Sequence, residues 1–153
     1  EKESFHETTE IYVNGHQANS LLLIEPKGPG SYQKSLKTRG PGLHHIAIDV
    51  LNIDDFIQSI SGSGWFLHLN SLKTLKDSKT IYLARPGFPT LIEVQEKNKF
   101  TDGSNFVEEV VLNFPSELTR LLVPLSLENF VKNSPRPLAL KLQGSVFSLD
   151  ELL

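Results

Sequence analysis

The chain has 153 residues and a formal net charge of −3, from 15 basic and 18 acidic side chains. These charges are scattered and form no basic block, which disfavours a nucleic-acid partner or a polybasic membrane anchor. The longest apolar run, Leu21 to Ile24, is far shorter than the roughly 20 residues of a membrane span. No signal-peptide pattern follows Glu1. We therefore expect a cytoplasmic protein with no membrane partner.

Cysteine is absent, while 39 % of the residues are hydrophobic. The apolar fraction is that of ordinary globular proteins and provides for a real core. Without cysteine there is no disulfide framework, no thiol nucleophile and no cysteine-type zinc site. A bound metal would therefore need histidine, carboxylate or amide ligands.

The N-terminal segment predicts a β-hairpin followed by a linker. Thr9 to Val13 alternates polar and apolar residues, and Asn14-Gly15 is the dipeptide that a type I′ turn prefers. The return strand is expected over Ala18 to Glu25. The segment from Lys27 to Gly42 contains two Gly-Pro-Gly breakers, so we expect it to be a linker.

The middle of the chain predicts a strand, a helix and three more strands. Leu43 to Val50 is mostly apolar with β-branched residues, as in a strand. Ile53 to Ile60 places apolar residues at i, i+3, i+4 and i+7, which predicts an amphipathic helix with Asn52 as its N-cap. The further strands are expected over Trp65 to Leu69, Lys79 to Leu83 and Thr90 to Gln95.

The last third begins this order again. Phe106 to Phe114 predicts a strand, and a helical pattern follows Ser116, although Pro124 should break or kink that helix. Ala139 to Leu149 predicts a returning strand. Repetition of the pattern suggests a single domain over 1–153. It would hold a complete βαβββ module over 43–96, the last strand pair of another module over 1–26, and a βαβ segment over 106–150.

The stretch Gly-Pro-Gly-Leu-His-His-Ile-Ala-Ile-Asp-Val from Gly40 to Val50 resembles the start of the second module of methylmalonyl-CoA epimerases. Those enzymes belong to the vicinal oxygen chelate superfamily, with glyoxalase I and the bleomycin-resistance proteins. Leu91 to Gln95 is similar to the last strand of the same module, and Leu23 to Pro26 to the end of the preceding one. The resemblance extends over Leu21 to Glu96, about half of the chain.

The resemblance implies an α+β fold, in which paired βαβββ modules form an open, mostly antiparallel, barrel-like sheet with helices outside. The incomplete first module would be completed by the C-terminal segment, which we favour, by a second copy in a homodimer, or by sequence upstream of Glu1.

The resemblance also implies a divalent metal, Zn, Mn, Co, Ni or Fe, held by side chains from the end strands of both modules. The metal histidine corresponds to His45 and the strand glutamate to Glu93. The ligand of the earlier module falls at Leu22 or Leu23, which cannot bind a metal. Glu109 in the C-terminal segment is the candidate third ligand. In such an enzyme Glu93 or Glu109 would take a proton next to a carbonyl.

Each candidate also has a structural interpretation. Adjacent residues of a strand face opposite sides, so His44 or His45 is expected to point away from the site. His45 would then be a hydrogen-bonded structural residue, while Glu93 and Glu109 would be exposed acids. Tyr82 is expected to pack in a wall.

Two functions follow from the resemblance. One is a metal-dependent lyase or isomerase of the glyoxalase or epimerase type, acting on a small molecule or an acyl thioester. The other is a metal-free small-molecule-binding protein of the same fold, which the leucine at the ligand position favours.

Overall fold

The computed structural model of the chain describes residues 6–10, 19–100 and 105–152. In this part of the chain the strands form one two-stranded and two four-stranded sheets. Both larger sheets contain parallel as well as antiparallel pairs. The predicted α+β class is therefore confirmed, while the described sheets do not join into a closed barrel.

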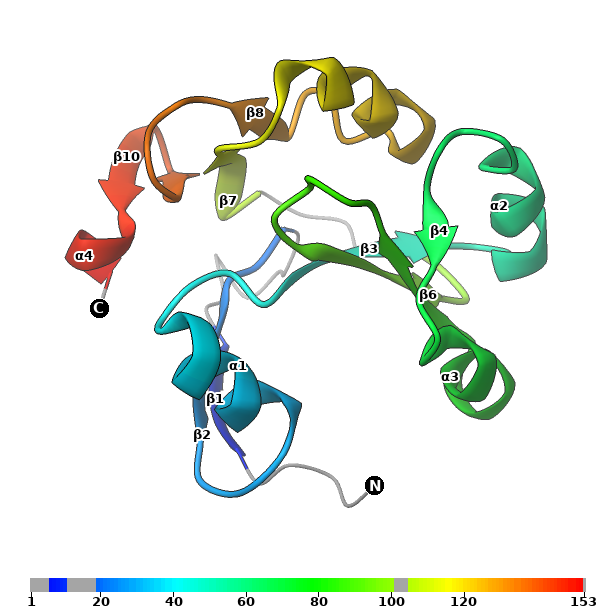
Figure 1. The fold of residues 1–153 in the computed structure, drawn as a ribbon, viewed down its shortest axis with the longest axis horizontal. Helices are drawn as coiled ribbons and strands as arrows, with labels where there is room; N and C mark the ends of the chain where they lie inside the picture. Colours follow the sequence, from blue (N-terminus) through cyan, green and yellow to red (C-terminus); the bar gives the residue numbers. More distant parts are fainter. Residues whose placement is uncertain (1–5, 11–18, 101–104, 153) are drawn as a thin grey trace.

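The middle sheet has the strand order β3-β6-β5-β4 (Figure 1). β3 pairs in parallel with β6, whereas β6 with β5 and β5 with β4 are antiparallel. Helix α2 (Ile53–Ser59) leads from β3 towards β4. The strands are β3 (His45–Val50), β4 (Phe66–Leu67), β5 (Thr80–Ala84) and β6 (Leu91–Glu96). This sheet has the strand and helix order predicted for 43–96, with an additional helix between β4 and β5.

The predicted helix cap is present at α2. Asn52 Oδ1 accepts hydrogen bonds from the backbone N–H groups of Asp54 and Asp55, at 2.9 and 3.0 Å. A carboxylate from the neighbouring strand satisfies one more free N–H, because Glu96 Oε2 accepts from Ile53 N at 2.9 Å. The start of the helix is therefore fixed both by its own cap and by the end of β6.

Three helices were not predicted, among them the short α4 (Leu149–Leu152), which begins at the last residue of an expected strand. α1 (Ser31–Arg39) lies in the expected linker and buries none of its residues, so it lacks the apolar periodicity that identifies a helix in sequence. α3 (Ser71–Ser78) lies between the strands expected over Trp65 to Leu69 and over Lys79 to Leu83, where no element was predicted. Ser71 holds α3 on the sheet, since its hydroxyl donates to Tyr82 O and accepts from Tyr82 N, at 3.0 and 2.8 Å.

The C-terminal sheet has the strand order β10-β9-β7-β8. Its strands are β7 (Val107–Leu112), β8 (Val131–Asn133), β9 (Ala139–Leu142) and β10 (Ser145–Ser148), and a short helix α4 (Leu149–Leu152) follows. β7 lies inside this sheet, between β9 and β8, whereas β3 lies at the edge of the middle sheet. The last third therefore repeats the element order of the middle module and not its strand pairing.

Two details of this sheet correct the prediction. The single strand expected over Ala139 to Leu149 is a hairpin, turned by Gln143 and Gly144, both of which have positive φ. The helix after Ser116 is a 3₁₀ helix, η1 (Ser116–Leu125), with Pro124 inside it. Because proline lacks an N–H and clashes with the preceding turn, a regular α-helix is disfavoured here.

β1 (His6–Glu10) and β2 (Leu22–Pro26) form the two-stranded sheet. The Asn14-Gly15 turn expected between them lies outside the described residues. Among the described residues neither strand pairs with the C-terminal sheet, and one backbone bond, Val107 N to Asn19 O at 2.8 Å, connects the two regions. The expected completion of this strand pair by the C-terminal segment is thus not seen in the described part of the chain.

The middle sheet and η1 contribute to one hydrophobic core. Figure 1 shows η1 lying above this sheet. Trp65 joins the two, because its buried Nε1–H donates to the carbonyl of Leu121 on η1 at 2.7 Å. Its indole also contacts Phe88 edge-on, with the ring centroids 5.3 Å apart.

Trp65→Phe is therefore expected to lower the free energy of unfolding by about 1–2 kcal/mol, because a buried hydrogen bond is lost while most of the aromatic packing is kept. Urea denaturation of both proteins measures this difference. Val123→Ala, at an exposed position of the same helix, serves as the control and should change stability by less than about 0.5 kcal/mol. An equal loss of stability in the two variants would show that Trp65 does not hold η1 against the middle sheet.

Candidate functional site

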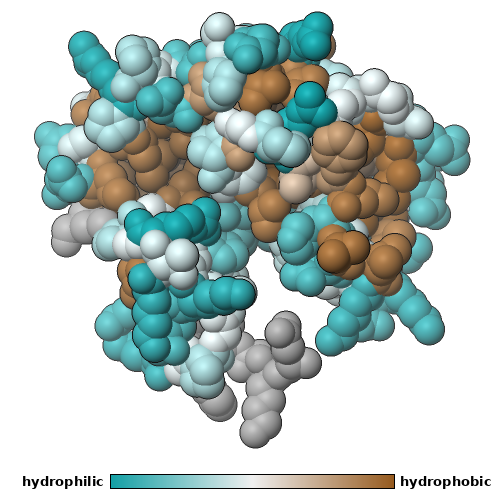
Figure 2. All heavy atoms as spheres, viewed as in Figure 1, coloured by the Kyte–Doolittle hydropathy of each residue, from teal (hydrophilic) through white to brown (hydrophobic). Residues whose placement is uncertain are grey.

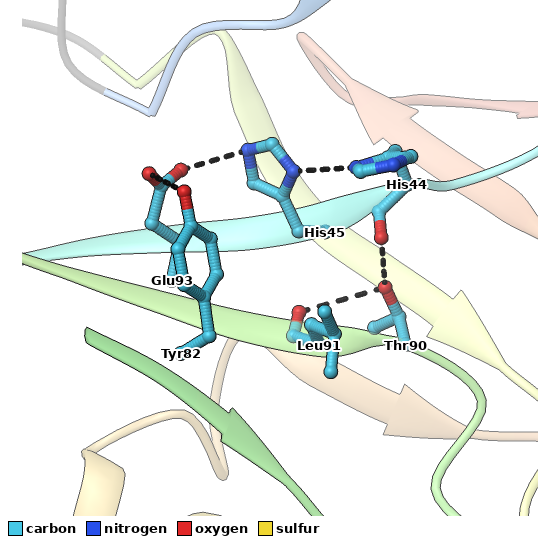
Figure 3. A network of polar contacts seen from close by, with 6 residues as sticks. All are labelled: His44, His45, Tyr82, Thr90, Leu91 and Glu93. Atoms are coloured by element: carbon cyan, nitrogen blue, oxygen red, sulfur yellow. Dashed lines mark hydrogen bonds and ion pairs between the residues drawn. The ribbon is translucent and has the colours of Figure 1, made fainter. Parts of the chain in front are cut away.

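The alternation of β6 separates its core residues from its polar residue. Ile92 and Val94 are fully buried on one face, and Glu93 lies between them on the other. Glu93 stands opposite Tyr82 on β5 and next to Ala47 on β3. His45 is two residues before Ala47 and shares its face. Three neighbouring strands thus bring His45, Tyr82 and Glu93 together (Figure 3).

The Glu93 carboxylate receives a hydrogen bond on each oxygen. Tyr82 Oη donates to Oε1 and His45 Nε2 donates to Oε2, both at 2.9 Å. The side chains of His45 and Glu93 are only 19 % and 11 % exposed. A carboxylate buried to this degree needs such partners, because burying an uncompensated charge is costly.

These contacts keep Glu93 ionised. Burial by itself would raise the pKa of the carboxyl group, but hydrogen bonds from His45, Gln95 and Tyr82 together lower this pKa to about 2. Burial, and then the negative charge of Glu93, raises the pKa of the Tyr82 phenol. The pair therefore stays a phenol hydrogen-bonded to a carboxylate, and Glu93 is a weak base at neutral pH.

His44 extends the network on the other side of His45. The two Nδ1 atoms are 2.9 Å apart, so one of them donates and the other accepts. Burial, followed by the neighbouring charges of His45 and Arg39, lowers the pKa of His44. His44 is therefore neutral around pH 7.

The expectation that His44 and His45 face opposite sides is wrong. β3 begins at His45, so His44 precedes the strand and is not bound by its alternation. The His44 carbonyl accepts from Thr90 Oγ1 at 3.0 Å, and its ring lies 4.6 Å from the ring of Tyr32. These contacts turn the His44 imidazole towards His45.

Glu109 does not join His45 and Glu93. It stands opposite Lys141 in the β7–β9 pair, and its Oε1 lies 3.8 Å from Lys141 Nζ. Its neighbour Val110 points to the other face of β7 and lines the cleft described below. Because adjacent positions alternate, Glu109 faces away from that cleft. The expected third ligand is instead part of a surface ion pair.

The polar network opens into a large cleft of about 1280 Å³. β2, α1, β3, β7, β9 and α4 all contribute to its walls, which also include His44, His45 and Glu93. Most other lining side chains are aliphatic or aromatic, among them Leu22, Leu23, Ile48, Val110, Phe130 and Leu140. Figure 2 shows apolar side chains gathered on this face, between the C-terminal sheet and α1.

Leu22 and Leu23 are 45 % and 39 % exposed, and both line this cleft. A metal enzyme of the expected type would need an oxygen or nitrogen ligand at one of these positions. Within the described residues there is no group of three or more His, Cys, Asp or Glu side chains that could hold a metal ion. The donor set around His45 and Glu93 therefore does not fit a metal centre built from this part of the chain.

The sequence indicated His45 and Glu93 but neither Tyr82, which binds Glu93, nor Tyr32, whose ring contacts His44. Tyr82 was expected to pack in a wall, yet its hydroxyl binds Glu93. In the structure β5 and β6 are joined by a loop over 85–90, and this register places Tyr82 opposite Glu93. The turn expected at Arg85-Pro86-Gly87 is centred too early in the chain to indicate this contact. Nothing in the sequence pattern placed Tyr32, because α1 was not predicted.

Comparisons of the chain with family models, with curated proteins and with solved structures find no match. Among the described helices none is long and apolar enough to cross a membrane. The cleft and its polar network are therefore the features from which a function can be inferred.

Proposed function

We propose that this protein binds a small, largely apolar molecule in the cleft and that it does so without a metal ion. The observation that carries the proposal is the cleft itself, which is mostly apolar and has a buried, charged carboxylate in its wall. Small-molecule sites typically combine an apolar lining with a few fixed polar groups. Leu22 and Leu23 fit this function, because exposed leucines in a concave wall gain stability when a ligand covers them.

The Tyr82–Glu93–His45 network would provide specificity. Its hydrogen bonds hold the carboxylate in one orientation and leave lone pairs for another donor. A ligand with a hydroxyl, amide or amine group near its apolar part would place that donor against Glu93. Such a preformed acceptor favours ligands that carry the donor over those that lack it.

Equilibrium binding of 1-octanol tests this function, because it has an eight-carbon chain and one hydroxyl. Titration of the full chain, followed by the methyl NMR signals of its leucines and isoleucines, should show saturable binding with a Kd of about 0.1–1 mM. The methyl signals of residues that line the cleft should shift, and those of residues in the β4–α3 region should not. Shifts that grow without saturation, or that spread over the whole surface, would contradict the proposal.

A metal-dependent lyase or isomerase of the glyoxalase or epimerase type is the second candidate. His45 Nε2 and Glu93 Oε2 are 2.9 Å apart, a separation that two ligands of one metal ion also adopt. The metal centre would need a further ligand that the described residues of a single chain do not supply. A second copy in a homodimer is one source of it. Elemental analysis of protein purified without chelator separates the candidates.

We expect that elemental analysis to find far less than one divalent ion per chain. Stoichiometric Zn, Mn, Co, Ni or Fe in the unmodified protein would favour the enzyme, provided that both His45→Ala and Glu93→Ala remove it. Circular dichroism of the two variants controls for loss of the fold.

A further inference from the structure

A second, smaller hollow lies next to the cleft and shares His44 with it. Its volume is about 190 Å³, and its wall includes Arg39, His44, Arg85 and Thr90. Arg39 is the last residue of α1, and Arg85 directly follows β5. Two arginines from separate elements therefore line one small space.

The positive charge of these arginines is not neutralised by the described residues. In residues 19–100 and 105–152 no ion pair within 4.0 Å connects Arg39 or Arg85 to a carboxylate. Arg85 Nη1 donates to the carbonyl of Gly64 at 3.0 Å, and its guanidinium lies over the ring of Phe66, 5.5 Å from the centroid. These contacts orient the Arg85 side chain without compensating its charge.

Arg85 also carries a polar atom that the fold leaves unsatisfied. Its Nε is buried and has no hydrogen-bond partner. A buried N–H without an acceptor costs about 1–3 kcal/mol, so such atoms are uncommon in folded proteins. The unsatisfied Nε shows that the described residues provide no acceptor on this side of the guanidinium, and an anionic oxygen is a strong acceptor for the N–H groups of such a side chain.

We propose that the hollow bordered by Arg39, His44 and Arg85 binds a small oxyanion, a phosphate or a carboxylate group. Its volume suits a single group of this kind, and the planar guanidinium fork binds both through paired N–H donors. Thr90 Oγ1, already bonded to the His44 carbonyl, fixes the wall between the hollow and the start of β6.

The position of His44 extends this inference to the ligand of the cleft, an extension that rests on the proposed function. Because His44 lines both spaces, an anionic group in the hollow lies next to an apolar chain in the cleft. The ligand class is then an anionic amphiphile, such as an alkyl phosphate or a fatty carboxylate.

Inorganic phosphate and acetate test the anion site without any apolar chain. The full chain, labelled with ¹⁵N in arginine, is titrated with each anion at constant ionic strength, and the arginine Nε–H signals are followed. We expect the Arg85 signal to shift saturably, with a Kd of about 1–10 mM. A response to phosphate alone would assign the hollow to phosphate groups, and a response to both anions would assign it to small oxyanions in general.

Two variants and a control make the result specific to this hollow. Arg39→Gln and Arg85→Gln should each weaken anion binding at least about fivefold, while Arg136→Gln, exposed on the C-terminal segment, should not. Arg39 is exposed, so its variant keeps the test valid if Arg85→Gln fails to fold. Unchanged affinity in Arg39→Gln, or an equal loss in Arg136→Gln, would overturn the proposal.

Octyl phosphate and 1-octanol separate this inference from the proposed function. If both are correct, octyl phosphate binds more tightly than 1-octanol, and Arg39→Gln reduces only the binding of octyl phosphate. Inorganic phosphate binding without any 1-octanol binding would support the anion site and contradict the proposed function. Binding of 1-octanol without any binding of inorganic phosphate would overturn the anion site and leave the proposed function supported.

Discussion

Replacing Glu93 with glutamine is expected to lower the free energy of unfolding near pH 7 by about 3 kcal/mol. The pKa of Glu93 falls from an ordinary value of 4.5 to about 2 in the folded protein, and each unit of this difference corresponds to about 1.4 kcal/mol. Glutamine keeps the size of the side chain but has no charge, and its NH₂ group cannot accept one of the two bonds from His45 and Tyr82.

The pH dependence of this loss has a definite sign. Because folding lowers the pKa of Glu93, its stabilising contribution is fully present above about pH 4.5 and is lost as the pH falls towards 2. The difference between the unmodified protein and Glu93→Gln should therefore shrink between pH 5 and pH 3 in urea denaturation. Glu128→Gln, at an exposed position, is the matched control and should show no such trend. A difference that stays constant over this range would contradict the ionised, hydrogen-bonded carboxylate.

Ala47→Trp is expected to weaken the binding of 1-octanol at least tenfold, a change of about 1.4 kcal/mol or more. Ala47 lines the cleft, shares the face of His45 and stands beside Glu93 in the parallel pair of β3 and β6. An indole there would occupy the space next to the carboxylate. Ala47 is exposed, so the substitution adds volume to the cleft and not to the core.

The matched control for this substitution is Thr119→Trp, which adds an indole on exposed η1, away from the cleft. Its affinity for 1-octanol should equal that of the unmodified protein, and both variants should unfold at similar temperatures. Equal affinity in Ala47→Trp and Thr119→Trp would mean that 1-octanol does not bind beside Glu93.

The elements that sequence predicted well are those with a clear apolar period. α2 was identified because its apolar residues repeat at helical spacing after the Asn52 cap, and that cap is present. α1 buries no residue and is enclosed by Gly-Pro-Gly segments, so neither periodicity nor composition indicated it. The β9–β10 turn was missed because Gln143-Gly144 is a weaker turn signal than Asn-Gly.

The candidate site was predictable to the extent that it follows strand alternation. Ile92 and Val94 identified the buried face of β6 and hence the opposite direction of Glu93. The same rule failed for His44, because that residue lies one position before the strand. The expected position of Glu109 beside His45 and Glu93 depended on how the C-terminal strands pair. β7 lies inside its own sheet, and Glu109 stands opposite Lys141 there. Long-range pairing of this kind leaves no local signal in the sequence.

Intermolecular NOEs locate a bound ligand, and they therefore show whether the cleft beside His45 and Glu93 is a ligand site. With 1-octanol bound to the full chain, we expect NOEs from its methylene protons to the methyl groups of Leu22, Ile48 and Leu140, which line the cleft. NOEs confined to exposed leucines outside the cleft, such as Leu69 and Leu72, would contradict the claim.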